Sequence, residues 1–174
     1  PYSKTYFCVP PNLHIIGTMN TSDRSVESLD AALRRRFTFV EQKPAPEILS
    51  QVPVSGVDLK RMLTKINQRI SILLDEDHLI GHSYFLEVNN FAELKSVFAN
   101  KILPLLQEYF YGDLGKIGLV LGREFLAEQK FSSDDFANFD YEYMHELTDK
   151  KVYQIRNVEE LEAAAFIRIY EKDY

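Results

Sequence analysis

Apolar residues recur at steps of three and four in two segments between residues 59 and 109. Such spacing places them on one face of a helix. Asp58 and Asn90 stand where a side chain can cap the first turn of the helix that follows. Pro104 lies inside the second stripe and predicts a kink there, because proline lacks a backbone N–H. The two apolar stripes are Leu59, Met62, Leu63, Ile66, Ile70, Leu73 and Leu74, and Leu94, Val97, Phe98, Ile102, Leu105, Leu106 and Tyr109.

The last third of the chain has weaker periodicity. The glycine-rich segment 112–122 predicts a short helix between turns. Residues 131–148 are acidic and aromatic without a clear period, which predicts a loop excursion or a short irregular hairpin. Asn157 with Glu160 resembles a capping box before an alanine-rich helix that ends near Tyr170.

The first forty residues have a different pattern, in which short apolar runs alternate with turn residues. A helix is predicted over Ser25–Arg36, because its apolar positions recur at steps of three and four. Pro44 and Pro46 interrupt the pattern and indicate a boundary between two units. The apolar runs that predict strands are Thr5–Val9, Leu13–Thr18 and Phe37–Val40.

Composition narrows the class of protein. Hydrophobic residues make up 45% of the 174 residues and aromatic residues 13%, which is enough for a packed core. The net charge of −6 favours a cytoplasmic protein and gives no overall case for nucleic-acid binding. A single cysteine excludes an intrachain disulfide and a multi-cysteine zinc site. No apolar run approaches the ~18 residues of a membrane span, so we expect no membrane association.

Candidate chemistry begins where the predicted strand Leu13–Thr18 ends in short polar residues. In open α/β sheets, ligands bind at the carboxyl ends of strands. Asn20 could orient a water or contact phosphate oxygens, and Asp23 could accept hydrogen bonds from a base. Alternatively, Asp23 or Ser25 only caps the next helix.

Three adjacent arginines, Arg34, Arg35 and Arg36, end the predicted helix. They span roughly 200° around the helix axis and cannot share one face. A solvated basic end that interacts with the helix dipole is one interpretation. The other is that one of the guanidinium groups reaches a phosphate on a neighbouring subunit, where it would stabilise transition-state charge.

These two segments, in this order, resemble the second half of an AAA+ core, with Asn20 at the sensor-1 position and arginine fingers before strand five. The segment 19–25 (MNTSDRS) followed by 33–37 (LRRRF) is more narrowly similar to the McrB family, the GTPase subunits of methylcytosine-specific restriction systems. Residues 78–85 (HLIGHSYF) and 105–121 resemble the lid of that family.

The resemblance implies an α+β, mainly helical fold: the C-terminal part of an AAA+ α/β core at residues 1–43, followed by an all-α lid at residues 47–174. We expect the chain to be a C-terminal fragment of a longer enzyme. AAA+ sheets have strand order 5-1-4-3-2, so strand one, expected between the last two predicted strands, is missing here. Unpaired strand edges tend to associate, which predicts local rearrangement or chain–chain pairing in this part.

The resemblance also implies site residues. Asn20, Thr21 and Asp23 match the family's nucleotide-binding motif, and Arg35 and Arg36 match its trans-acting arginines. The lid residues His82 and Ser83, with the neighbouring Tyr84, are expected near the nucleotide, although a packed loop is an equally good interpretation. The complete enzyme would use GTP and Mg²⁺, form a hexameric ring, act with a McrC-like endonuclease subunit and contact DNA through domains absent here.

Three sequence motifs of nucleotide or metal sites are absent or incomplete in this chain. No Gly-x-x-x-x-Gly-Lys-[Ser/Thr] loop is present, since Gly115-Lys116 lacks the flanking residues, so we expect no bound nucleotide and no GTPase activity from this chain alone. Residues 72–76 (ILLDE) imitate a Walker B strand but continue a helical period. His78 and His82 have metal-ligand spacing without the glutamate of a zinc protease. Three alternatives remain: a MoxR-like AAA+ ATPase, a non-enzymatic partner-binding module and a DNA-binding module.

Overall fold

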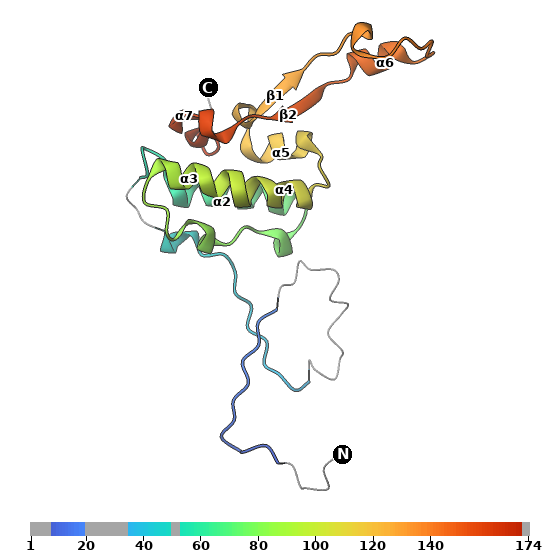
Figure 1. The fold of residues 1–174 in the computed structure, drawn as a ribbon. Helices are drawn as coiled ribbons and strands as arrows, with labels where there is room; N and C mark the ends of the chain where they lie inside the picture. Colours follow the sequence, from blue (N-terminus) through green and yellow to red (C-terminus); the bar gives the residue numbers. More distant parts are fainter. Residues whose placement is uncertain (1–7, 20–34, 50–52, 172–174) are drawn as a thin grey trace. The chain divides into compact units, whose positions relative to one another are not determined.

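The structure is a computed structural model that describes residues 8–19, 35–49 and 53–171 (Figure 1). It divides into two compact units, Pro1–Phe39 and Val40–Tyr174. The domain ranges 1–43 and 47–174 stay a prediction.

The described residues of the first unit contain no strand. The predicted strands over Leu13–Thr18 and Phe37–Val40 are therefore wrong: Ile16 is 93% exposed, and both segments are irregular. A strand needs ladder hydrogen bonds from a neighbour, and no described segment supplies them here. Neither segment pairs with another described segment of the first unit, so the predicted local rearrangement into new strand pairs is not seen there. Pairing between two chains stays a prediction. Of the predicted Ser25–Arg36 helix, only Arg35 and Arg36 are described, and they lie in a turn.

The second unit begins with a short helical turn, η1 (Pro46–Ile48), and then the 15-residue helix α2 (Leu59–Leu73). The predicted cap is confirmed, since Asp58 Oδ1 accepts the Arg61 N–H at 2.9 Å. The predicted apolar stripe faces the core, with Met62, Leu63 and Ile66 fully buried. The Asp75-Glu76 pair follows the end of this helix and starts η2 (Glu76–His78), so the segment 72–76 is a helix terminus and not a strand.

A second long helix runs from Phe91 to Tyr109 and changes its pitch in the middle (Figure 1). It consists of α3 (Phe91–Val97), the π-turn η4 (Phe98–Ile102) and α4 (Leu103–Tyr109), and Asn90 caps its start as predicted. The structure has this π-turn directly before Pro104, where the sequence predicted a kink. Proline cannot donate to the carbonyl four residues back, and a wider turn directly before it accommodates that loss.

The range 47–174, predicted to be all-α, also contains two strands, which corrects that part of the expectation. After α5 (Leu114–Leu121) and η5 (Arg123–Phe125), the strands β1 (Leu126–Gln129) and β2 (Val152–Ile155) pair antiparallel. Leu126 lies opposite Ile155, and Gln129 lies opposite Val152. The excursion predicted over residues 131–148 connects these strands and contains η6 (Ser133–Asp135) and α6 (Met144–Asp149).

The chain then forms η7 (Val158–Glu160) and α7 (Ala163–Ile167). The predicted alanine-rich helix forms as α7, but Asn157 does not cap it, which corrects the prediction. Asn157 Oδ1 accepts the Glu159 N–H at 3.1 Å and so caps η7, while its amide nitrogen donates to the Glu160 side chain at 3.0 Å. Leu161 has extended backbone angles, which separate η7 from α7.

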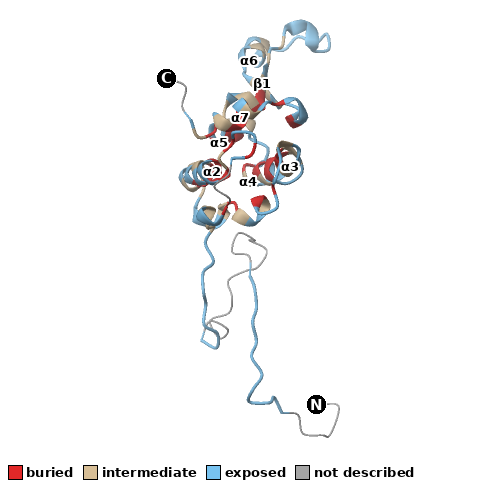
Figure 2. Cartoon of the chain, turned by 90° about the vertical axis from the view of Figure 1, so that its left-hand side faces the viewer, coloured by how far each residue is buried: buried red, intermediate tan, exposed pale blue. Residues whose placement is uncertain are grey.

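Buried residues line the inner sides of the helices of the second unit (Figure 2). Its core combines the inner face of α2 with a cluster of four phenylalanines. Phe98 lies at the centre of this cluster, with its ring centroid 4.9 Å from that of Phe166 and 5.7 Å from that of Phe125. Phe85 completes the group at 6.2 Å. Edge-to-face and offset contacts of this kind add to the burial of the rings. Across the described ranges, no helix is long and apolar enough to cross a bilayer.

Candidate functional site

The predicted site residues divide between the two units. Asn20, Thr21 and Asp23 lie outside the described residues. Arg35 and Arg36 lie side by side in an exposed turn of the first unit. His82 and Ser83 begin η3 (His82–Phe85) in the second unit, where His82 is half-buried and Ser83 is exposed.

A buried amide fixes the loop that leads to His82. Asn67 is 8% exposed and lies on the inner face of α2. Its Nδ2 donates to the Ile80 carbonyl oxygen at 2.9 Å, and its Oδ1 accepts the Ile80 N–H at 2.8 Å. Both backbone groups of Ile80 are thereby satisfied away from water, and an unmade bond there would cost a desolvation penalty.

His82 also holds the segment that enters the lid. Its Nδ1 accepts the backbone N–H of Ala45 at 3.0 Å. An accepting Nδ1 in a neutral imidazole leaves the ring proton on Nε2, so Nε2 is the nitrogen that can donate to a ligand. The neighbouring Ser83 offers a hydroxyl group from an exposed position.

An ion pair joins the same two segments. Lys43 Nζ lies 2.8 Å from Glu76 Oε2. This hydrogen bond raises the pKa of Lys43 and lowers the pKa of Glu76. Both side chains are mostly exposed, so the pair adds little to stability but still favours one position of the segment.

The two histidines with metal-ligand spacing have separate partners. His78 Nδ1 contacts Asp75 Oδ1 at 2.6 Å, and its ring packs edge-on against Tyr109 with the centroids 4.8 Å apart. The hydrogen bond from His78 lowers the pKa of the Asp75 carboxyl group. His82, by contrast, binds the Ala45 backbone. Within the described ranges, no three His, Cys, Asp or Glu side chains come together as a metal site.

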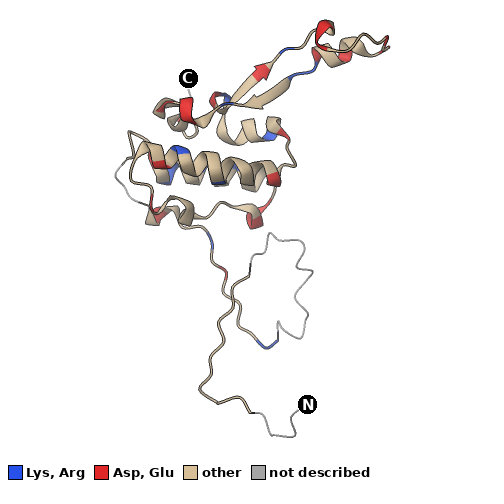
Figure 3. Cartoon of the chain, viewed as in Figure 1, with Lys and Arg blue, Asp and Glu red and all other residues tan. Residues whose placement is uncertain are grey.

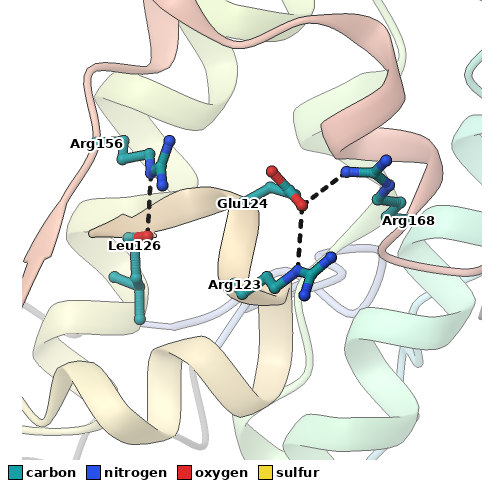
Figure 4. A network of polar contacts seen from close by, with 5 residues as sticks. All are labelled: Arg123, Glu124, Leu126, Arg156 and Arg168. Carbon is teal, nitrogen blue, oxygen red and sulfur yellow. Dashed lines mark hydrogen bonds and ion pairs between the residues drawn. The ribbon is translucent and has the colours of Figure 1, made fainter. Parts of the chain in front are cut away.

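An open groove of about 490 Å³ lies between α5 and the base of the β1–β2 ribbon, and arginines line part of it. Figure 4 shows how these arginines are engaged. Glu124 Oε1 accepts from Arg168 at 2.7 Å and from Arg123 at 3.4 Å, and Arg156 Nε donates to the Leu126 carbonyl oxygen at 3.0 Å. The Glu124–Arg168 contact links η5 to the end of α7, and the Arg156–Leu126 contact links the two strands at their base. These arginines therefore have structural partners.

Sequence reasoning missed Asn67 and Ala45. Asn67 could have been found, because it is the one polar residue at an inward-facing position between Leu63 and Ile70. Ala45 contributes a backbone N–H, which no side-chain pattern reveals.

Comparison with known proteins shows which family the helical segment 58–118 resembles. The family described as the alpha-helical lid domain of McrB matches residues 58–118, which contain α2, η3 and α4. The chain is also 38% identical over 125 residues to the Type IV methyl-directed restriction enzyme EcoKMcrB subunit of Escherichia coli (strain K12). This match covers 62% of the present chain and 27% of the Escherichia coli protein, so the chain spans about a quarter of that relative. The resemblance seen in the sequence is thus confirmed: residues 58–118 match the α-helical lid domain of McrB, and the chain is similar to a McrB subunit over 125 residues.

Proposed function

We propose that this chain is the lid-bearing part of an AAA+ GTPase subunit in a modification-dependent DNA restriction system. The match of residues 58–118 to the McrB lid carries the proposal. The name of the Escherichia coli relative, a methyl-directed restriction enzyme subunit, supports the biological setting. The complete protein would hydrolyse GTP with Mg²⁺, assemble as a hexameric ring, act with a McrC-like endonuclease and contact DNA through other domains.

In this proposal, the first unit supplies polar and cationic groups to a nucleotide held between subunits. Asn20 positions the attacking water or senses the γ-phosphate, while Thr21 and Asp23 bear on nucleotide choice. Arg35 and Arg36 stabilise transition-state charge on the nucleotide of a neighbouring subunit. Their exposed, adjacent position in a turn is compatible with this role.

The lid supplies hydrogen-bond donors. The His82 Nε2–H and the Ser83 hydroxyl suit the oxygen atoms of a nucleotide, whereas neither residue can replace a phosphate-binding loop or a set of magnesium ligands. Those groups would come from a P-loop segment of the complete protein. The bound GTP and Mg²⁺ would supply the transferable phosphoryl group and its charge neutralisation.

The test is hydrolysis by the full-length protein, measured with GTP and with ATP. We expect turnover of GTP, and a loss of about 10³-fold or more when Arg35 and Arg36 are both changed to alanine. Arg123→Ala, an exposed arginine of the lid, is the matched control and should retain full activity. Hydrolysis of ATP alone would instead indicate a MoxR-like ATPase and contradict the proposal.

Mixed assemblies test whether the arginines act across the interface. Neither the Asn20→Ala protein nor the Arg35→Ala/Arg36→Ala protein should turn over GTP alone. Mixing them creates interfaces where an intact Asn20 meets an intact arginine pair, so part of the activity should return. If no mixing ratio restores activity, the arginines do not act in trans.

A further inference from the structure

The β1–β2 ribbon carries an excursion that is distinct from the rest of the lid (Figure 1). We call residues 131–149 the acidic aromatic tip. It contains no Lys or Arg. Its six carboxylates carry a formal charge of −6, the same value as the net charge of the whole chain. Figure 3 shows acidic residues along this segment and basic residues only near its base. The carboxylates are Asp134, Asp135, Asp140, Glu142, Glu146 and Asp149.

The same tip exposes large apolar side chains. Phe139 is 74% exposed and is the most accessible of them. The rings of Tyr141 and Tyr143 contact each other edge-on at 5.8 Å, and neither residue belongs to the buried core. The exposed set is Phe136, Phe139, Tyr141, Tyr143 and Leu147.

Exposure of a cluster of apolar side chains to water is unfavourable in free energy. Single exposed apolar residues are normal, whereas grouped aromatic residues on a soluble protein mark contact sites. In typical protein interfaces, a few buried anchor residues, often aromatic ones, supply most of the binding energy. Across the described ranges, no Lys or Arg forms an ion pair with a carboxylate of the tip, so their charge is available to a partner.

We infer that the acidic aromatic tip is a docking surface for a protein partner whose apolar pockets are bordered by Lys and Arg. Charge complementarity selects this partner, because six carboxylates are interspersed with the aromatic residues along the tip. Duplex DNA is excluded by the same charge, since its phosphates would be repelled. Pairing of two tips would place like charges opposite each other, which disfavours a second copy of this chain at the same surface. The inference goes beyond GTP hydrolysis and does not depend on it.

The first experiment measures binding of the 174-residue chain to a defined probe by fluorescence anisotropy. The probe is a synthetic 18-residue amphipathic peptide with leucines on one face and lysines on the other. A matched peptide with glutamate in place of lysine controls for charge, and labelled duplex DNA is the third ligand. We expect binding of the lysine peptide only. Equal binding of the glutamate peptide, or binding of DNA through the tip, would overturn the inference.

Variants locate the binding surface. Phe139→Ser/Tyr141→Ser removes rings and keeps charge, whereas Asp140→Asn/Glu142→Gln removes charge and keeps rings. Each should weaken peptide binding at least about tenfold, as expected for hot-spot residues. The control is Ile72→Ser, an equally exposed apolar side chain on α2, which should change binding less than about twofold. Unchanged binding by both tip variants would refute the proposal.

Two further measurements test whether the variants unfold and whether the tip binds a second copy of the chain. The thermal unfolding of the tip variants should match the parent chain, because these side chains lie outside the core. Sedimentation should show the same oligomeric state for the parent and for the Phe139→Ser/Tyr141→Ser variant. A dimer that dissociates on this substitution would show that the tip binds a second copy, and the inferred partner would be wrong.

Discussion

The side-chain amide of Asn67 in α2 makes both possible hydrogen bonds to the backbone of Ile80, at 2.9 and 2.8 Å. Asn67 is the buried polar side chain of the described core, and Ile80 stands two residues before His82. The pair thus connects the most regular helix of the lid to the loop that carries the family-like residues. Packing alone could not fix that loop, because apolar contacts are non-directional.

The substitution Asn67→Leu keeps the branched shape and the number of side-chain heavy atoms and removes both hydrogen bonds. The Ile80 N–H and carbonyl would remain buried without partners, so we expect a loss of about 2–4 kcal/mol in the free energy of unfolding. Urea denaturation followed by circular dichroism measures this. Gln68→Ala, an exposed neighbour on the same helix, should change stability by less than about 0.5 kcal/mol. An Asn67→Leu protein as stable as the parent would show that the amide contributes nothing net.

Tyr170 ties the end of the described chain to the start of α2. Its hydroxyl oxygen accepts the Asp58 N–H at 3.0 Å, while its ring lies 4.7 Å from the Arg61 guanidinium carbon. Tyr170→Phe removes the hydrogen bond and keeps the ring, so stability should fall by about 1 kcal/mol. Tyr111→Phe, with a side chain on an 87%-exposed residue, is the control and should leave the unfolding midpoint unchanged.

The two ring nitrogens of His82 can be tested separately. Asparagine can present an acceptor near the position of Nδ1 but has no donor at the position of Nε2, whereas alanine has neither. We expect His82→Ala to lose about 1 kcal/mol of stability and His82→Asn to lose less, because the Ala45 N–H keeps an acceptor. Differential scanning fluorimetry of the 174-residue chain measures the difference.

In the full-length protein, the same two variants address nucleotide hydrolysis. If Nε2 donates to the nucleotide, both should lower GTP turnover about 10- to 100-fold, as for a hydrogen bond to a charged group. Full activity of a stable His82→Asn protein would restrict His82 to holding the Ala45 segment.

The Asp75 carboxylate predicts a pH dependence of stability. Its pKa lies below the ordinary value of 3.8, chiefly because of the hydrogen bond from His78. A lowered folded-state pKa gives stability that is complete above about pH 4 and is lost as the pH falls through the folded-state pKa. Asn caps helical turns as well as Asp does, so Asp75→Asn removes the charge and keeps the cap.

Unfolding midpoints of the two proteins between pH 2 and 7 provide the measurement. The parent should be more stable than Asp75→Asn near neutral pH, by less than about 1 kcal/mol because the carboxylate is half exposed. The two curves should converge at the acid end. A constant difference across this range would contradict the assignment.

Local sequence patterns were sufficient to predict the two long helices of the lid. The apolar stripes after Asp58 and Asn90 and the capping side chains are local features of a helix, and both helices begin as predicted. The motif-like segments 78–85 and 105–121 were sufficient to indicate the McrB lid that the comparison confirms. The site residues in both units stay predictions, since their chemistry depends on a bound nucleotide.

Non-local contacts decided the rest. The pairing of β1 with β2 was missed because Leu126–Gln129 has little strand propensity, and its partner lies beyond the whole acidic aromatic tip. The segment Leu13–Thr18 shows the converse: strand-like residues form no strand in this chain, since a ladder needs a neighbour. The sequence by itself therefore determined where α2 and α3 begin and which side chains cap them, and it indicated the McrB-like lid. Only the tertiary structure decided which backbone groups Asn67 and His82 bind, because those partners are set by how distant segments pack.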